Sequence, residues 1–187
     1  MSIPPAVPRE ELHHRRIDCR GYRRHDGLYD IEGRVTDLKA GNFDLPFGRG
    51  VLPEGKPLHD MWVRMTVDED LLIHDIIAST ESWPWTPCPE ASAAVSALKG
   101  VRIGPGFLRA IRDKLGGAKG CTHIAELLPQ VATTAFQTLS PVRSQKPDRL
   151  DATGRPVKID SCYAYSRHRE LVRDRWPAFY EPEGKSE

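Results

Sequence analysis

The hydrophobic period changes once along the chain, and this change constrains the fold more than any other feature of the sequence. Up to residue 78, apolar and polar side chains alternate, as in β-strands that bury one face. After residue 88 the apolar spacing becomes three to four residues, as on one side of an α-helix. We therefore expect an α+β fold with strands first and helices second. The predicted strands cover residues 12–22, 28–38, 59–67 and 71–78.

Short turns are expected inside each pair of strands. His25-Asp26-Gly27 separates the first two, and an Asp-Gly pair tolerates the positive φ of a tight hairpin turn. Asp68-Glu69-Asp70 separates the last two. Residues 40–57 are rich in glycine and proline and form a loop between the pairs. These turns predict a mostly antiparallel sheet of two hairpins.

Three helices are expected to pack on one face of this sheet. The first two cover residues 89–99 and 106–115, and each is stopped by glycine. The third starts at Thr122, and Pro129 inside it predicts a kink or a break after two turns. Its predicted buried side consists of Ile124, Leu127, Leu128, Val131, Ala135, Phe136 and Leu139.

Composition divides the chain into three regions. Residues 1–11 are rich in proline and predict an N-terminal arm, and residues 12–140 form the α+β core domain. Residues 141–187 predict a C-terminal extension that packs on the core. Residues 157–165 within it predict a last strand.

Composition also excludes several classes of protein. A chain of 187 residues with a formal net charge of +1 gives no support for a nucleic-acid binder. No apolar run approaches the ~20 residues of a membrane-spanning helix, and we expect no secretory signal, because the first residues lack a basic region followed by an apolar stretch. Four irregularly spaced cysteines are too few for a disulfide framework. We expect a cytoplasmic protein with reduced thiols, and a homo-oligomer is left open.

The segment from Gly120 to Glu126, with the sequence GCTHIAE, carries the most functional information. It places the Cys121 thiol and the His123 imidazole two residues apart, where a glycine-rich turn becomes a helix. Free backbone N–H groups and the positive end of the helix dipole favour a thiolate there. Because a thiolate is the reactive and metal-binding form of cysteine, we expect any reactive centre to include this segment.

The order of the segments resembles the iron–sulfur scaffold fold of the NifU/IscU type over about residues 57–139. The residues that carry this resemblance are 61–68, Ile73-His74-Asp75, Cys88 and 121–126. In that family three cysteines and an aspartate surround a metal site at one end of the sheet. The resemblance therefore implies an α+β core of the same kind.

The resemblance also implies a set of metal ligands. Cys88 and Cys121 match the second and third family cysteines. His59 falls on the aspartate position or one residue from it, next to Asp60. The first family cysteine has no counterpart, because Pro57-Leu58 occupy its place. This departure leaves a mononuclear metal site.

Almost the whole chain also resembles a bacterial family known as domain of unknown function 2889. The matching segments are 21–33, His59-Asp60-Met61 and Gly120-Cys121-Thr122-His123. This resemblance supports the domain definition and implies no activity. It suggests that His59, Cys88 and Cys121 belong to one pattern, with Cys162 as a further candidate.

We therefore predict His59, Cys88 and Cys121 as metal ligands, with Cys162 or His123 as a fourth. Zinc and iron(II) accept thiolate and imidazole, and a catalytic zinc site has three protein ligands and one open position. An open position lets the metal activate water or polarise a substrate carbonyl. The alternative is that each cysteine is a small buried residue that fills space beside a helix start.

Three residues are candidate catalytic groups: His123, Asp60 and Arg64. His123 offers an acid or base, and Arg64 can pair with an anionic substrate, because guanidinium binds carboxylate or phosphate bidentately. The arginines of residues 12–24 offer the same chemistry or form a solvated strand. Trp83-Pro84-Trp85 walls a pocket for an aromatic ligand or simply links the sheet to the helices.

The sequence thus favours a metal-dependent enzyme, a lyase or hydrolase with one zinc or iron ion and a small anionic or aromatic organic substrate. Besides an interaction module whose cysteines are packing residues, two alternatives stay open. The first is a metal or iron–sulfur carrier or scaffold. The second is a hydrolase with Cys121 as nucleophile and His59 as base. His123 is disfavoured as that base, since two residues along a helix it projects from a different face.

Overall fold

The computed structural model describes residues 7–183, and the chain forms two compact units that divide between Ser140 and Pro141. The first unit contains the sheet and the helices predicted for the core domain. Of the predicted N-terminal arm, residues 1–11, residues 1–6 lie outside the described residues, and residues 7–11 form no helix or strand. The packing of the C-terminal extension on the core stays a prediction.

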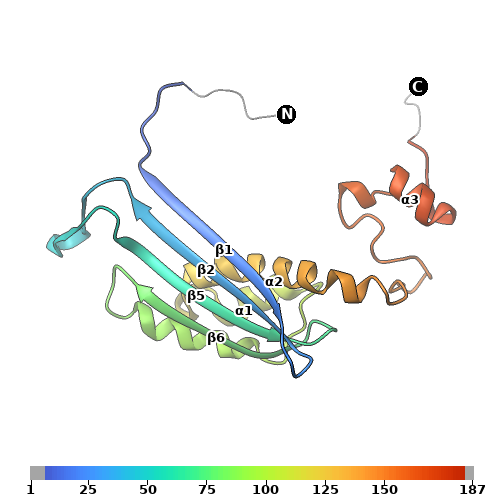
Figure 1. The fold of residues 1–187 in the computed structure, drawn as a ribbon, viewed down its shortest axis with the longest axis horizontal. Coiled ribbons are helices and arrows are strands. Elements are labelled where there is room, and N and C mark those ends of the chain that lie inside the picture. Colours follow the sequence, from blue (N-terminus) through green and yellow to red (C-terminus); the bar gives the residue numbers. More distant parts are fainter. Residues whose placement is uncertain (1–6, 184–187) are drawn as a thin grey trace. The chain divides into compact units, whose positions relative to one another are not determined.

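The first unit is built on a four-stranded antiparallel sheet in the order β1-β2-β5-β6 (Figure 1). The predicted α+β class and the mostly antiparallel sheet are confirmed, and each hairpin joins strands that are neighbours in sequence. The strands are β1 (His13–Arg23), β2 (Tyr29–Lys39), β5 (Pro57–Val67) and β6 (Ile73–Ser82). The predicted loop over residues 40–57 holds a small hairpin of β3 (Phe43–Asp44) and β4 (Val51–Leu52) around the 3₁₀ turn η1 (Pro46–Gly48).

Aspartate side chains hold both hairpin turns, as the sequence predicts. Asp26 accepts a hydrogen bond from the Leu28 backbone N–H, and Gly27 adopts a φ of +86°. Asp68 accepts hydrogen bonds from the backbone N–H groups of Asp70 and Leu72. These bonds satisfy backbone donors where the chain reverses, so the turn residues fix which strands pair.

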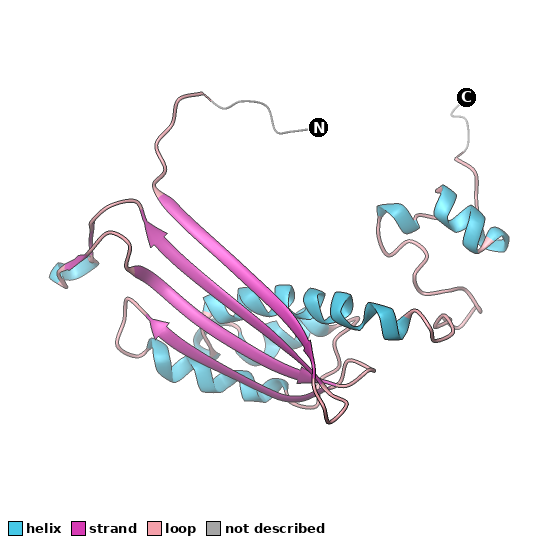
Figure 2. Cartoon of the chain, viewed as in Figure 1, coloured by secondary structure: helices cyan, strands magenta, loops and turns pink. Residues whose placement is uncertain are grey.

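The helical elements cover one face of the sheet (Figures 1 and 2). They are η2 (Cys88–Leu98), α1 (Phe107–Leu115), η3 (Gly117–Lys119) and α2 (Thr122–Arg143). The first is a 3₁₀ helix and not the expected α-helix. Its buried residues explain the difference, because Ser92, Val95 and Leu98 recur every three residues, which is the 3₁₀ period.

Helix α2 runs unbroken through Pro129, so the predicted break is wrong, while the alternative of a kink stays a prediction. A proline removes one backbone hydrogen bond, whereas the apolar side of α2 is buried on both sides of that position, at Leu127, Leu128 and Val131. Burial of this side outweighs the lost bond. Of the residues predicted on it, Phe136 differs, since it is 41% exposed.

Two glycines let α2 approach the sheet closely. A Cβ atom on Gly33 of β2 would lie 2.5 Å from Cγ2 of Val131, and one on Gly21 of β1 would lie 1.8 Å from Oγ1 of Thr138. No side chain fits in these gaps. The sheet residues around Gly33 are buried, including Ile31, Val35, Met61 and Val63.

The described part of the second unit, residues 141–183, contains the end of α2, short helices, turns and an isolated bridge between Leu150 and Pro156. The short helices are η4 (Tyr163–Tyr165), α3 (Glu170–Arg175) and η5 (Pro177–Phe179). The strand predicted over residues 157–165 is wrong, because Asp160 has a φ of +64° and reverses the chain. Its carboxylate accepts hydrogen bonds from the backbone N–H and the guanidinium of Arg167. Within residues 7–183, no helix combines the length and the apolar character needed to cross a membrane.

Replacement of Gly33 by alanine tests the close approach of α2. We expect Gly33→Ala to lower the free energy of unfolding by about 1–3 kcal/mol, because the added methyl group overpacks the contact with Val131. The matched control is Gly104→Ala, since a Cβ atom there meets no atom within 4 Å. Urea unfolding followed by circular dichroism gives both values. Equal effects of the two substitutions would contradict the packing argument.

Candidate functional site

Three adjacent strands and the start of α2 place polar side chains together at one end of the sheet. Asp37, near the end of β2, pairs with Arg15 of β1 on one side and with His59 of β5 on the other. Asp37 and His59 share the helix-covered side of the sheet, because odd-numbered residues of β2 and β5 face the core. The Asp37 side chain is only 2% exposed.

Four groups surround the buried Asp37 carboxylate. The Arg15 guanidinium donates from Nε to Oδ1 at 2.7 Å and from Nη2 to Oδ2 at 2.8 Å. Nδ1 of His59 lies 2.9 Å from Oδ2, and Nε2 of His13 lies 3.2 Å from Oδ1. Burial alone would raise the pKa of Asp37, but the hydrogen bonds and charges of Arg15 and His59 outweigh it and lower the pKa to about 2.

His123 completes the cluster from the first turn of α2. Its ring stacks on the ring of His59 with the centroids 3.8 Å apart, and its Nε2 atom lies 3.9 Å from Oδ2 of Asp37. Both imidazoles are partly exposed, His59 at 13% and His123 at 26% of the side chain. Burial and the charge of His123 lower the pKa of His59, so the neutral imidazole is favoured there.

Asp37, His59 and His123 offer three donor atoms within 4.8 Å of one another, and they are the only such group among residues 7–183. This group can hold a metal ion. Two ligands bound at zinc distances of about 2.0–2.2 Å and at angles of 90–110° are about 2.8–3.6 Å apart. The His59–Asp37 separation of 2.9 Å fits this range. The His123–Asp37 separation of 3.9 Å lies above it, so metal binding would require these two atoms to approach each other.

Cys121 lies beside this group and caps α2. Its carbonyl oxygen accepts the first helical hydrogen bond, from the backbone N–H of Ala125, and its Sγ atom lies 3.8 Å from Nδ1 of His123. Burial alone would raise the pKa of Cys121. Hydrogen bonds from the His123 ring and from the backbone N–H groups of Ile124 and His123 outweigh burial and lower this pKa.

The sequence-based argument against a direct Cys121–His123 contact is wrong. That argument placed both residues inside the helix, where positions two apart face different sides. Cys121 is instead the capping residue, so its side chain folds over the first turn and meets the His123 ring. The interaction with the Cys121 sulfur raises the pKa of His123.

The predicted ligand set of His59, Cys88 and Cys121 does not form a three-donor group. Cys88 opens η2, which packs against the edge strand β6, whereas the site is centred on β2. Cys162 is exposed in the second unit. Of the predicted ligands and catalytic residues, the structure therefore brings together His59, His123 and Cys121.

Asp60 and Arg64, predicted as catalytic, lie on the opposite face of the sheet. Asp60 follows His59 directly, and alternation turns its side chain away from the helices. It accepts two hydrogen bonds from Arg34, at 2.8 and 2.7 Å, and Arg64 pairs with Glu32. Both predicted residues are thus engaged in ion pairs outside the cluster.

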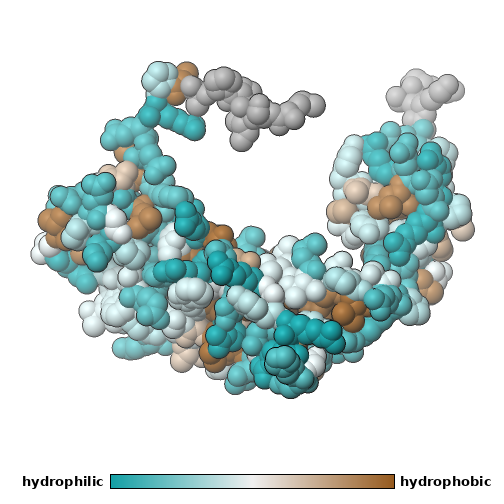
Figure 3. Space-filling view, in the orientation of Figure 1, coloured by the Kyte–Doolittle hydropathy of each residue, from teal (hydrophilic) through white to brown (hydrophobic). Residues whose placement is uncertain are grey.

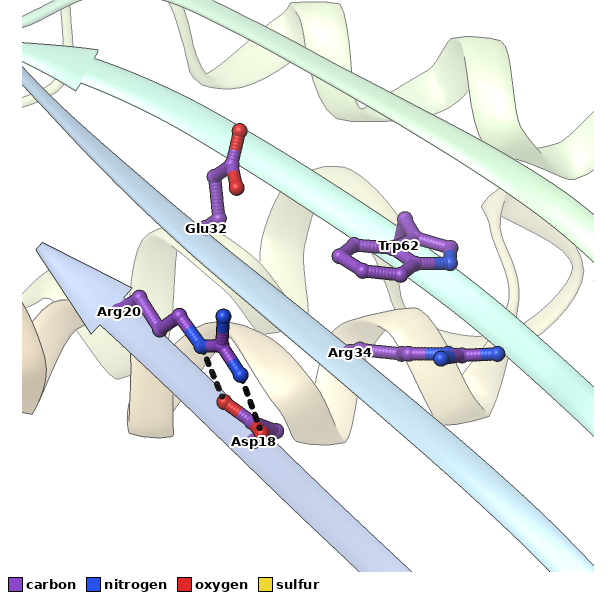
Figure 4. A pocket seen from close by; sticks show the side chains of 5 residues that line it. All are labelled: Asp18, Arg20, Glu32, Arg34 and Trp62. Carbon is purple, nitrogen blue, oxygen red and sulfur yellow. Dashed lines mark hydrogen bonds and ion pairs between the residues drawn. The ribbon is translucent and has the colours of Figure 1, made fainter.

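This open face is mostly hydrophilic (Figure 3) and carries a shallow hollow (Figure 4). Figure 4 shows Arg20 reaching to Asp18 and the Arg34 side chain extended beside the Trp62 indole. The Arg34 guanidinium lies 4.9 Å from the centre of the Trp62 ring. The hollow is lined by Asp18, Arg20, Glu32, Arg34 and Trp62. It is separated from the histidine cluster by the sheet itself.

Sequence reasoning missed Asp37, although the sequence holds a signal for it. Along β2 the core-facing positions are Tyr29, Ile31, Gly33, Val35 and Asp37, so a carboxylate continues an otherwise apolar face. A charged group at such a position needs a partner, and Arg15 and the histidines supply it. The single charged residue on the buried face of β2, Asp37, therefore marks the centre of the site.

The first unit is thus an α+β domain with a His-His-Asp donor set at one end of its sheet. It matches a family model described as a protein of unknown function (DUF2889) over residues 13–137, and the chain belongs to this family. The matched region contains all three donors and Cys121 but not Cys162. No curated protein and no solved structure matches the chain, so the likeness to the NifU/IscU fold stays a prediction.

Removal of the Arg15 charge tests the electrostatic role of this residue. With a chelator present, we expect Arg15→Met to lower the free energy of unfolding by about 1–2 kcal/mol, because Asp37 loses its main cation. The effect stays below that of a fully buried pair, since Arg15 is 38% exposed. Arg20→Met, which removes an exposed pair with Asp18, is the control and should leave the urea midpoint unchanged. Similar midpoints for both variants would contradict the role of Arg15.

Proposed function

We propose that the protein is a metal-dependent enzyme that binds one zinc or iron(II) ion through Asp37, His59 and His123. The observation that carries this proposal is the convergence of three donor atoms within 4.8 Å from three separate elements. Two imidazoles and one carboxylate suit both metals, and such a set leaves coordination positions for water and substrate.

The surroundings of the site support an anionic organic substrate. The metal would supply a Lewis acid that polarises a substrate oxygen or lowers the pKa of a bound water to ~7. Arg15 and His13 stand beside Asp37 at the exposed margin, where the Arg15 guanidinium attracts a carboxylate or phosphate. A lyase or hydrolase of a small anionic molecule fits these features best. A metal carrier is the alternative use of the same donors.

One observation favours a second candidate function, a cysteine hydrolase that needs no metal. The His123 ring lies between the Cys121 sulfur, at 3.8 Å from Nδ1, and the Asp37 carboxylate, at 3.9 Å from Nε2. This is the order of nucleophile, base and orienting carboxylate in such enzymes. The structure thus favours His123, and not His59, as the base of this candidate.

Metal titration separates the two functions. We expect the metal-depleted protein to bind one Zn²⁺ or Co²⁺ ion per chain in isothermal titration calorimetry. His59→Ala and His123→Ala each remove a direct ligand of the metal. Loss of a residue that only hydrogen-bonds to a ligand weakens metal binding about 10–100-fold, so each of these variants should weaken it by more than that.

His74→Ala is the matched control for this titration. Nε2 of His74 also lies 2.9 Å from a carboxylate oxygen, that of Asp68, but this pair belongs to no three-donor group among residues 7–183. The His74→Ala variant should bind the metal ion with the same affinity as the wild type. Absence of metal binding by the wild type, together with rapid alkylation of Cys121, would reject the metal proposal and leave the cysteine hydrolase.

A further inference from the structure

We infer that Cys121 is a positioning residue of the metal site, which holds the His123 ring so that Nε2 faces the metal position. This inference rests on the proposed metal-dependent function and assigns Cys121 a role different from that of a ligand. It follows from the contacts of the two ring nitrogens of His123, of which one faces Cys121 and the other faces Asp37.

The two ring nitrogens of His123 have separate partners. Nε2 lies toward Oδ2 of Asp37, at 3.9 Å, on the side of the three-donor group. Nδ1 lies 3.8 Å from Sγ of Cys121. A metal-bound histidine generally donates its second N–H group to an acceptor, which fixes the tautomer and the orientation of the ring. In this chain a sulfur atom occupies the place usually taken by a carboxylate or a carbonyl oxygen.

The backbone around Cys121 fixes the sulfur at this point. The Cys121 carbonyl oxygen accepts the hydrogen bond from Ala125 that starts α2. Gly120 passes so close to the end of α1 that a Cβ atom there would lie 2.9 Å from the carbonyl oxygen of Leu115. These contacts hold the backbone at Gly120 and Cys121, and the backbone N–H groups of His123 and Ile124 donate to the Cys121 sulfur and hold it over the first turn of α2.

The same geometry argues against Cys121 as a direct ligand. The Cys121 sulfur does not belong to the three-donor group. It contacts Nδ1 of His123, so the His123 ring lies between the sulfur and the Asp37 carboxylate. Direct coordination would require the sulfur to leave the ring nitrogen that it faces. The motif of cysteine and histidine two residues apart thus supplies one ligand and the group that orients it.

Cobalt binding to the full chain tests the inference. We expect the wild type to bind one Co²⁺ ion without the near-ultraviolet charge-transfer absorption of a cobalt–thiolate bond. Cys121→Ala should keep the stoichiometry but weaken the affinity about 10–100-fold, because the second nitrogen of His123 loses its acceptor. Cys121→Ser should recover part of this loss, since a hydroxyl oxygen accepts the same hydrogen bond.

Cys88→Ala is the matched control, because this cysteine also opens a helical element but lies outside the cluster. Its cobalt affinity should equal that of the wild type, and metal-free melting temperatures show whether each variant folds. A cobalt–thiolate band that disappears in Cys121→Ala would overturn the inference, as would wild-type affinity in that variant. A wild type that binds no cobalt would instead reject the proposed function itself.

Discussion

The buried carboxylate of Asp37 is the interaction on which this end of the molecule depends. A charge at 2% exposure is costly unless cations or hydrogen-bond donors surround it. The chain supplies Arg15 from β1, His59 from β5 and His123 from α2, so three elements distant in sequence meet at one group. A negative charge surrounded by two imidazoles is also what a divalent cation needs. The stability of this region and its proposed chemistry therefore have the same origin.

The glycines of the sheet connect the packing to the site. Gly21 lies against Thr138, and Gly33 lies against Val131. From the Gly33–Val131 contact, Asp37 lies four residues toward the end of β2, and His123 lies eight residues toward the start of α2. Helix and strand thus run in opposite directions, and the close approach at the glycines sets the level at which the helix start meets the carboxylate. A helix held further from the sheet would separate His123 from Asp37.

The parts of the structure that local chemistry determines could be predicted from the sequence. Alternation gave the four strands, the Asp26-Gly27 turn gave the first hairpin, and the Gly120-Cys121 step gave the start of α2. To predict that η2 is a 3₁₀ helix and not an α-helix, the exact spacing of its buried residues is needed. The strand predicted over residues 157–165 was wrong because Asp160 turns the chain and accepts hydrogen bonds there. These errors arise where side chains override the hydrophobic period.

The ligand set was harder to predict, because it depends on which elements meet in space. The expectation for Cys88 came from the order of segments in another fold, whereas here the element that carries it packs on β6. Asp37 escaped notice because a carboxylate near a strand end is usually solvated. The contact between His123 and Cys121 was misjudged because Cys121 caps the helix and does not belong to its surface. The sequence signal for Asp37 was the alternation of β2, which places this carboxylate on the buried face of the strand.

X-ray absorption spectroscopy at the zinc edge of the zinc-loaded protein tests the central claim most directly. A site made of His59, His123 and Asp37 predicts nitrogen and oxygen neighbours at about 2.0–2.2 Å with the scattering pattern of two imidazoles. It predicts no sulfur neighbour. A sulfur shell at about 2.3 Å would show that a cysteine binds the metal and would contradict the account.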